Sequence, residues 1–386
     1  MLSDLKSKKK SGIFPFLSNL KIDWIMFSSV IVISFFGLLT MSSFVSTDPF
    51  LEKQIIWLII SIIVFFALSF VDYRFLNKTN VVVAIFLFFL TLLFALFVIG
   101  HTAKGAESWF QIGGLSFQPS DPIKLVLIIL LAKYFSRRHV EIANIKHIFV
   151  SGFYAFIIFI LVLFQPDFGS ALIIFLIWLG MIFVSGISKR HLLLVFLLGA
   201  IAFSFLWVYG LKDYQKNRII NFLHPLSDIR GSGYNAYQST IAIGSGQMFG
   251  EGVGYGTQSK LKFLPEYETD FIFSAFAEEW GFIGVVILFL FFGIFIWRII
   301  LNAYYGATNF EILFGLGLAI LFMSHFLVNV GMSLGLMPVT GITFPFMSYG
   351  GTNLLSSFTG LGILMGMRRY RRDAHKDTIK NEFLGL

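Results

Sequence analysis

The sequence of 386 residues contains no cysteine and few charged residues, and these two absences exclude several classes of protein. Without cysteine, no disulfide can stabilise an exported segment and no thiolate can serve as nucleophile or metal ligand. Only 13% of the residues are charged and 57% are hydrophobic, whereas a typical soluble domain has about 25% charged residues. Too few polar groups are present to cover a water-facing surface, so the composition excludes a soluble globular enzyme.

Basic residues outnumber acidic residues by 29 to 21, which gives a formal net charge of +8. Such an excess can indicate nucleic-acid binding, but here long apolar runs separate the charged residues. Membrane topology explains this distribution better, and we expect a membrane protein without a nucleic-acid partner.

Apolar segments long enough to cross a bilayer of ~30 Å recur along the chain. The clearest cover residues 24–44, 54–71, 80–100, 148–164, 168–186, 191–210, 282–300 and 311–335. Two weaker segments, 122–136 and 345–367, contain Lys124 and a glycine-rich stretch. The sequence therefore predicts an all-α polytopic membrane protein with about ten transmembrane helices. We expect residues 24–368 to form one membrane domain between a basic N-terminal arm, 1–23, and a basic tail, 369–386.

The distribution of lysine and arginine predicts the orientation of these spans. An even number of spans places both ends of the chain on one side, and most basic residues flank the spans on that side, which the positive-inside rule makes cytoplasmic. The longest outer connection covers residues 211–270 and contains Lys212, Lys216, Arg218, Arg230, Lys260 and Lys262. This loop either binds an anionic ligand at the outer face or is an ordinary solvated loop.

Polar residues inside predicted spans are informative, because each is costly in a bilayer and needs a partner or a purpose. Ser120, Asp121 and Pro122 have the pattern of a helix N-terminus, with Ser120 or Asp121 as the cap. Lys124 follows Asp121 by three residues and shares a helix face with it. Its amine either reaches to the outer surface or faces a polar cavity that contacts substrate, and we favour the cavity.

Two outer segments have a structural and a functional interpretation. The first is Gln-Pro-Asp at residues 165–167. Its simpler interpretation is structural, a tight turn in which Asp167 caps the following helix. The glycine-rich segment 244–256 matches no nucleotide-binding motif. It either packs within the outer loop or brings backbone N–H groups close to an anion.

A cluster of carboxylates precedes the span at 282–300. Its members are Glu266, Glu268 and Asp270. Thr269 or Asp270 can cap the following helix, but an ionised carboxylate near cations is also what a general base for a hydroxyl requires. Glu278 and Glu279 lie two turns deeper, where their burial would favour an ion pair, with Lys124 among the candidate partners.

Seven short motifs, taken in order and spacing, resemble the SEDS family (shape, elongation, division and sporulation) over nearly the whole chain. They are residues 105–109 (Gly-Ala-Glu-Ser-Trp), 117–120 (Phe-Gln-Pro-Ser), 165–167 (Gln-Pro-Asp), 256–259 (Gly-Thr-Gln-Ser), 263–266 (Phe-Leu-Pro-Glu), 269–273 (Thr-Asp-Phe-Ile-Phe) and 348–351 (Ser-Tyr-Gly-Gly). The Gly-Thr-Gln-Ser motif before Phe-Leu-Pro-Glu is similar to the RodA, or rod-shape, branch more than to the FtsW division branch.

The resemblance implies a ten-span glycosyltransferase that polymerises lipid II into peptidoglycan strands at the outer face of the bacterial cytoplasmic (inner) membrane. It implies a role in cell elongation and rod shape, together with a class B penicillin-binding transpeptidase. Asp270 matches the family's essential aspartate, while Trp109, Lys124 and Ser348 match motif positions that line the outer cavity.

This sequence departs from the family pattern at three places. Asp121 stands where the family usually has glutamate, and Thr352 where it usually has serine. Tyr267 and Glu268 follow the Pro-Glu pair where many relatives have a basic residue, which removes one candidate phosphate contact.

The chemistry implied by the resemblance assigns a role to each candidate residue. Deprotonating an acceptor hydroxyl requires a base, for which Asp270 is the candidate, and a departing pyrophosphate requires cations. The candidates for substrate binding are Lys124, Asp121, Trp109, Arg218, Lys260, Lys262 and Ser348. A divalent cation, Mg²⁺ or Mn²⁺, is compatible with this chemistry, although no ligand motif indicates one.

Two other functions are compatible with the sequence. Many spans with buried charges also suit a transporter that flips lipid II across the membrane, but the absence of a strong internal repeat disfavours transport. A non-catalytic scaffold of the cell-wall synthesis machinery is the third hypothesis.

Overall fold

The computed structural model describes residues 22–43, 50–99, 101–103, 106–112, 115–136, 145–186, 188–210, 213–224 and 233–384. Most of these residues are helical. The helices are α2 (Trp24–Ser42), α3 (Phe50–Ser69), α4 (Thr79–Ile99), α5 (Ser120–Ser136), α6 (Ile145–Phe164), α7 (Phe168–Val184), α8 (Lys189–Phe205), α9 (Asp213–Leu223), α10 (Tyr234–Ser245), α11 (Thr257–Lys260), α12 (Ile272–Tyr304), α13 (Asn309–Ser333) and α14 (Gly351–Leu384). A 3₁₀ turn, η1 (Tyr73–Asn77), precedes α4, and a π-helical turn, η2 (Leu206–Gly210), extends α8.

Seven helices in the described ranges are long and apolar enough to cross a membrane: α2, α3, α4, α6, α8 with η2, α12 and α13. The shorter apolar helix α7 coincides with a further predicted span. Helix α5 coincides with the weaker segment 122–136, whereas α14 begins within the weaker segment 345–367, at Gly351, and extends beyond it. The chain is therefore an all-α, multi-pass membrane protein, as the recurring apolar segments predicted.

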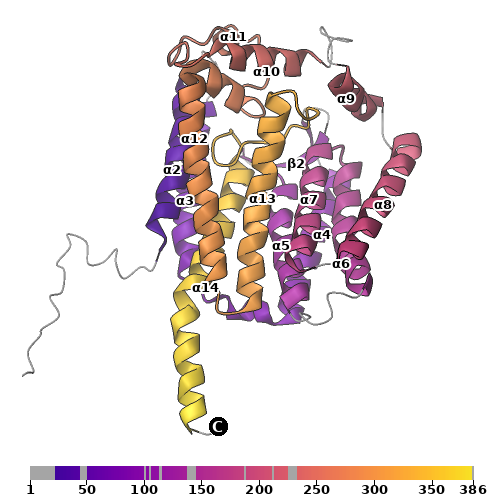
Figure 1. Cartoon of the computed structure of the whole chain (residues 1–386), viewed down its shortest axis with the longest axis vertical. Coiled ribbons are helices and arrows are strands. Elements are labelled where there is room, and N and C mark those ends of the chain that lie inside the picture. Colours follow the sequence, from indigo (N-terminus) through magenta and orange to yellow (C-terminus); the bar gives the residue numbers. More distant parts are fainter. Residues whose placement is uncertain are drawn as a thin grey trace, which may run out of the picture.

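The long helices form one bundle (Figure 1). Helices α10 and α11 lie across one end of it, and α14 extends beyond the other. Inside the bundle, α13 packs against α5, α7 and α12, while α14 packs against α3. In the most apolar part of α13, 61% of the residues are buried, the largest share among the seven spans. The polar side chains of Ser324, His325 and Asn329 on α13 are all buried and therefore face protein.

Residues between α4 and α5 form a small antiparallel sheet that the sequence did not predict. Its strands are β1 (His101–Ala103), β2 (Ala106–Ile112) and β3 (Leu115–Phe117), in the order β1-β2-β3. Trp109 pairs with His101, and Phe110 pairs with Phe117. The strands are too short to give a clear alternating pattern in a sequence. The hydroxyl of Thr352, at the start of α14, donates to the Ser116 carbonyl (3.3 Å) and connects the sheet to the bundle.

Helix α12 is broken at Gly281, where φ is 63° and ψ is −168°. The glycine-rich segment crosses the break and forms four backbone hydrogen bonds with it. They run from Glu251 N to Glu278 O (3.0 Å), from Gly252 N to Glu279 O (3.0 Å), from Phe282 N to Gln247 O (2.9 Å) and from Ile283 N to Met248 O (3.1 Å). Backbone groups freed by the break are thus satisfied, as a membrane protein requires. These contacts support the interpretation of the glycine-rich segment as packing within the outer loop.

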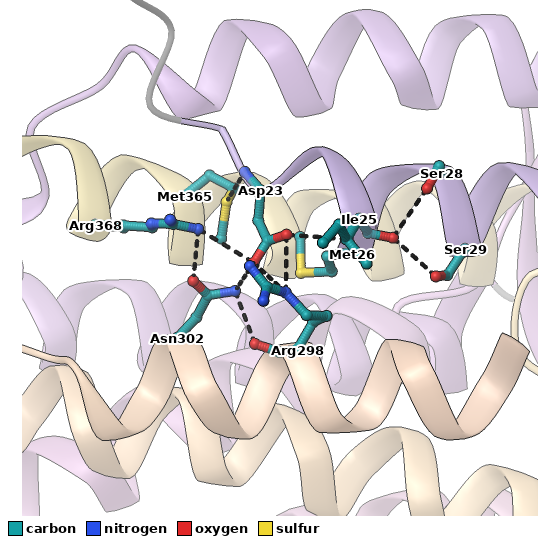
Figure 2. A network of polar contacts seen from close by, with 9 residues as sticks. All are labelled: Asp23, Ile25, Met26, Ser28, Ser29, Arg298, Asn302, Met365 and Arg368. Atoms are coloured by element: carbon teal, nitrogen blue, oxygen red, sulfur yellow. Dashed lines mark hydrogen bonds and ion pairs between the residues drawn. The ribbon is translucent and has the colours of Figure 1, made fainter. Parts of the chain in front are cut away.

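At the opposite end, the buried carboxylate of Asp23 connects three helices (Figure 2). It caps α2 by accepting from Met26 N (3.1 Å). It also pairs with Arg298 of α12 (2.7 Å) and Arg368 of α14 (3.2 Å), and it accepts from Asn302 Nδ2 (2.8 Å). The start of α2 and the extending part of α14 therefore lie at the same end of the bundle.

The predicted boundaries of the terminal segments remain predictions. Most of the predicted basic arm, residues 1–21, lies outside the described residues. Helix α14 continues through the predicted tail boundary at residue 369 to Leu384.

Candidate functional site

A small polar cavity of about 20 Å³ lies between α5, α13 and the start of α14. Its walls are Asp121, Lys124, Leu125, Leu321, Phe322, His325, Pro345, Asn353, Ser356 and Ser357. A space of this size holds about one water molecule. Six of these ten residues are polar or charged, which is unusual at membrane depth and marks the cavity as the first candidate for a functional site.

An ion pair between Lys124 and Asp121 forms one wall of the cavity. The Nζ–Oδ1 distance is 3.1 Å, and the side chains are only 3% and 7% exposed. Asn353 of α14 adds a hydrogen bond to the same carboxylate oxygen (3.4 Å). The structure thus confirms that Lys124 and Asp121 share a face and that Lys124 faces a polar cavity.

Glu278 and Glu279 do not pair with Lys124, because Asp121 occupies that position. Both glutamates are buried in α12. Glu278 accepts from Gln258 N (2.7 Å), and Glu279 accepts from Gly254 N (3.0 Å). The outer loop therefore supplies hydrogen-bond donors to both glutamates.

Two polar residues of α13 extend the site and were missed in the sequence. His325 lies on the cavity wall, and its Nδ1 lies 3.3 Å from the Thr343 carbonyl oxygen. Asn329, one helical turn further along, donates from Nδ2 to the carbonyl oxygens of Asp270 (2.9 Å) and Ile342 (2.7 Å). The only signal in the sequence was the presence of these two polar residues in an otherwise apolar helix. Burying a polar side chain in a membrane is costly, so each of them requires a hydrogen-bond partner or a function.

Asp270 lies just before α12, and its side chain is half-buried. Hydrogen bonds from its N–H to the Glu266 carbonyl and from Asn329 Nδ2 to its own carbonyl fix its main chain. Phe271, rather than Thr269 or Asp270, occupies the N-cap of α12, and no side-chain hydrogen bond caps this helix. The carboxylate faces Gly341, where an added Cβ would lie 3.4 Å from Asp270 Oδ2. Through Asn329, Asp270 is linked to the helix that carries His325 and the cavity wall.

Ser348 holds the other side of the same turn. Its Oγ donates to the Thr269 carbonyl (2.6 Å) and accepts from Phe344 N (2.8 Å). Gln54 of α3, which is also buried, donates to the Ser348 carbonyl (3.0 Å) and accepts from Gly350 N (3.3 Å). The Ser-Tyr-Gly-Gly motif therefore binds the backbone that precedes Asp270.

Four other candidate residues do not line the cavity. Trp109 is partly buried in β2. Arg218 lies on α9, and the side chains of Lys260 on α11 and Lys262 just after it are exposed. Helix α11 lies across one end of the bundle, together with α10 (Figure 1). Lys260 Nζ donates to the Gly254 carbonyl (3.3 Å).

The structure groups the candidate residues into two connected clusters. Asp121 and Lys124 form the first, and Asp270 and Ser348 belong to the second, joined by α13. In the ranges that the structure describes, no group of three or more His, Asp and Glu side chains could hold a metal ion.

The turn at residues 165–167 supports this region as predicted. Asp167 caps α7 through Ser170 N (2.9 Å). Its second oxygen accepts from Gln118 Nε2 (3.0 Å) and from Ser120 Oγ (3.4 Å), which connects the start of α7 to the start of α5. The predicted helix cap is confirmed.

The apolar helices and the charged cavity within them define a polytopic α-helical membrane protein with a polar site inside the bundle. The chain belongs to the FtsW/RodA/SpoVE family of cell cycle proteins, whose family model matches residues 16–373. This confirms the SEDS resemblance that the motifs indicated.

Relatives and solved structures agree with this assignment. The chain is 37% identical over 281 residues to the peptidoglycan glycosyltransferase MrdB of Escherichia coli (strain K12), covering 73% of this chain and 76% of the relative. It matches a chain from the structure of a peptidoglycan synthase complex with a TM-score of 0.77 and 30% identity, covering 90% and 98% of the two chains. It matches the crystal structure of the rod shape determining protein RodA of Thermus thermophilus with a TM-score of 0.68 and 30% identity, covering 90% and 97%. The MrdB and RodA matches support the RodA branch.

Proposed function

We propose that this chain is a peptidoglycan glycosyltransferase that polymerises lipid II at the outer face of the bacterial cytoplasmic membrane, for cell elongation and rod shape. The observation that carries the proposal is the half-buried carboxylate of Asp270, on a turn whose main-chain carbonyls accept hydrogen bonds from Asn329 and Ser348. The family to which the chain belongs includes peptidoglycan glycosyltransferases. A carboxylate held in place at a helix start is suited to accept a proton from a bound hydroxyl.

In this reaction Asp270 is the general base. The acceptor hydroxyl of one lipid-linked sugar attacks the anomeric carbon of another, and its proton passes to the Asp270 carboxylate. The bond from that carbon to the pyrophosphate breaks, and the pyrophosphate leaves with the bonding electrons. Because no enzyme nucleophile is involved, direct displacement inverts the anomeric centre. Both lipid tails stay in the bilayer, which explains why a multi-pass membrane protein serves this chemistry.

Lys124 is the cation that we assign to the leaving pyrophosphate. A buried amine next to a developing anion stabilises it more strongly than an exposed amine does. Asp121 balances the charge of Lys124 when no substrate is bound. Arg218, Lys260, Lys262 and Trp109 remain predicted substrate contacts of the outer loop and sheet.

We further propose that both ends of the chain are cytoplasmic and that the enzyme works with a class B penicillin-binding transpeptidase. The positive-inside bias supports the orientation. The match to a chain of a peptidoglycan synthase complex, in which polymerization and crosslinking are coordinated, supports the partner.

Purified protein supplied with lipid II, with and without the transpeptidase partner, tests the function. We expect glycan strands on a gel, in larger amounts with the partner. Vesicles containing the protein are assayed in parallel for exposure of lipid II at the outer leaflet. Absence of strands together with faster exposure would indicate the flippase instead, and absence of both would indicate the scaffold.

A further inference from the structure

Glu278 is a fully buried carboxylate that the mechanism above does not use. It lies on the outer part of α12, two turns after Asp270, and is 0% exposed. Among the residues that the structure describes, Glu278 forms no ion pair. A buried charge without a cation is tolerated only where hydrogen-bond donors surround it.

The donors to Glu278 come from the first three residues of α11. Gln258 N lies 2.7 Å from Oε1, Thr257 Oγ1 lies 3.3 Å from Oε1, and Ser259 reaches Oε2 through its N (3.3 Å) and its Oγ (3.2 Å). Gly256 permits this close approach, since an added Cβ there would lie 2.9 Å from Oε2. One carboxylate thus binds the last three residues of the Gly-Thr-Gln-Ser motif.

Short hydrogen-bonded turns connect α11 to Asp270. The Gln258 carbonyl accepts from Phe263 N (2.9 Å) and Leu264 N (3.0 Å), and Leu264 is fully buried. The Glu266 carbonyl then accepts from Asp270 N (3.0 Å). Backbone hydrogen bonds therefore fix the turn after Gln258 and the turn before Asp270, only Pro265 separates Leu264 from Glu266, and the first turn rests on Glu278.

We propose that Glu278 is a positioning residue for the general base, a proposal that rests on the function proposed above. Its carboxylate holds α11 against α12, and the connected turns set where the Asp270 carboxylate lies. An amide at position 278 would keep one acceptor but turn an N–H₂ group toward donors. Helix α11 would then be held less firmly against α12, and the Asp270 carboxylate would be displaced although Asp270 itself is unchanged.

Steady-state kinetics of lipid II polymerisation by the full-length protein test this proposal. We expect Glu278→Gln to lower kcat by about tenfold, the loss of a charge-assisted hydrogen bond, with KM for lipid II changed by less than about twofold. We expect Ser259→Ala to lower kcat by about threefold in the wild type and to have no further effect in Glu278→Gln. Ser245→Ala is the matched control, because its hydroxyl bonds only within α10, to the Ala242 carbonyl.

The results separate this proposal from the proposed function. A wild-type protein that makes no strands contradicts both. An active wild type with an equally active Glu278→Gln overturns the role of Glu278 alone, as do additive effects of Glu278→Gln and Ser259→Ala. If Glu278→Gln does not fold, the proposal is tested by comparing the kcat of Ser259→Ala with that of Ser245→Ala. Equal kcat values in those two variants overturn the proposal.

Discussion

Replacing Asp23 by alanine tests the contacts that connect the start of α2 with α12 and α14. The wild-type carboxylate is 1% exposed and accepts from two arginines, Asn302 and the Met26 amide. Asp23→Ala removes all of these bonds at once and leaves Arg298 and Arg368 without their buried partner.

The expected loss of stability follows from two contributions. Loss of a helix N-cap costs about 1 kcal/mol. Breaking a buried ion pair costs about 3–5 kcal/mol, but Arg298 is 25% and Arg368 37% exposed, so water can partly solvate the stranded charges. We therefore assign about 2 kcal/mol to the pairs, and expect a total of about 3 kcal/mol and a fall in melting temperature of about 5 °C.

Thermal unfolding in detergent, followed by tryptophan fluorescence, measures this effect. Asp72→Ala is the matched control, since Asp72 also caps a helical turn, through Arg74 N (3.0 Å), and pairs with Arg74 at 3.6 Å. That pair is exposed, and its loss should cost no more than about 1 kcal/mol. Equal melting temperatures for the two variants would refute the reasoning.

The pH dependence of this stabilisation has a definite sign. Burial by itself would raise the pKa of Asp23, but hydrogen bonds from Arg298, Asn302 and Met26 outweigh it and lower the pKa below its ordinary value. The stabilisation is therefore present above the unfolded pKa of about 3.9 and is lost as pH falls through the folded pKa. The difference in melting temperature between wild type and Asp23→Asn should narrow below about pH 4.

Two further predictions concern the site. Asn329→Leu should lower the polymerisation rate and the melting temperature together, because it leaves the carbonyls of Asp270 and Ile342 without their donor, and unchanged activity would contradict the anchoring role. Lys124→Met should lower the melting temperature more than Asp121→Asn combined with Lys124→Met, since only the single variant strands a buried carboxylate. Both variants should fail to polymerise lipid II, and activity in either would remove Lys124 from the mechanism.

The positions of most helices could be predicted from hydropathy, and the start of α12 is the clearest exception. The predicted spans 24–44, 80–100 and 311–335 agree with α2, α4 and α13 to within about two residues, the usual uncertainty of helix ends. Helix α12, however, begins at Ile272 instead of 282. The turns before Gly281 contain Glu278 and Glu279, which lower the hydropathy although both are buried and accept hydrogen bonds from the outer loop.

The site was predictable where its contacts are local in sequence. Lys124 and Asp121 are three residues apart, so their pairing follows from helix geometry. Asn329 acts instead on carbonyl oxygens of distant segments, and no side-chain pattern reports a backbone acceptor. The hydrogen bond of Ser348 could not be predicted from the sequence for the same reason, because its hydroxyl donates to the main-chain carbonyl of Thr269.

The central claim is that Asp270 is the general base of a lipid II polymerase, and the initial rate of glycan-strand synthesis by Asp270→Asn tests it most directly. Asparagine keeps the size of the side chain and cannot accept the proton. Asp72→Asn, at the exposed start of η1, is the control. We predict that Asp270→Asn lowers the rate by about 100-fold or more, while the control keeps the wild-type rate. Strand synthesis at the wild-type rate by Asp270→Asn would contradict the account.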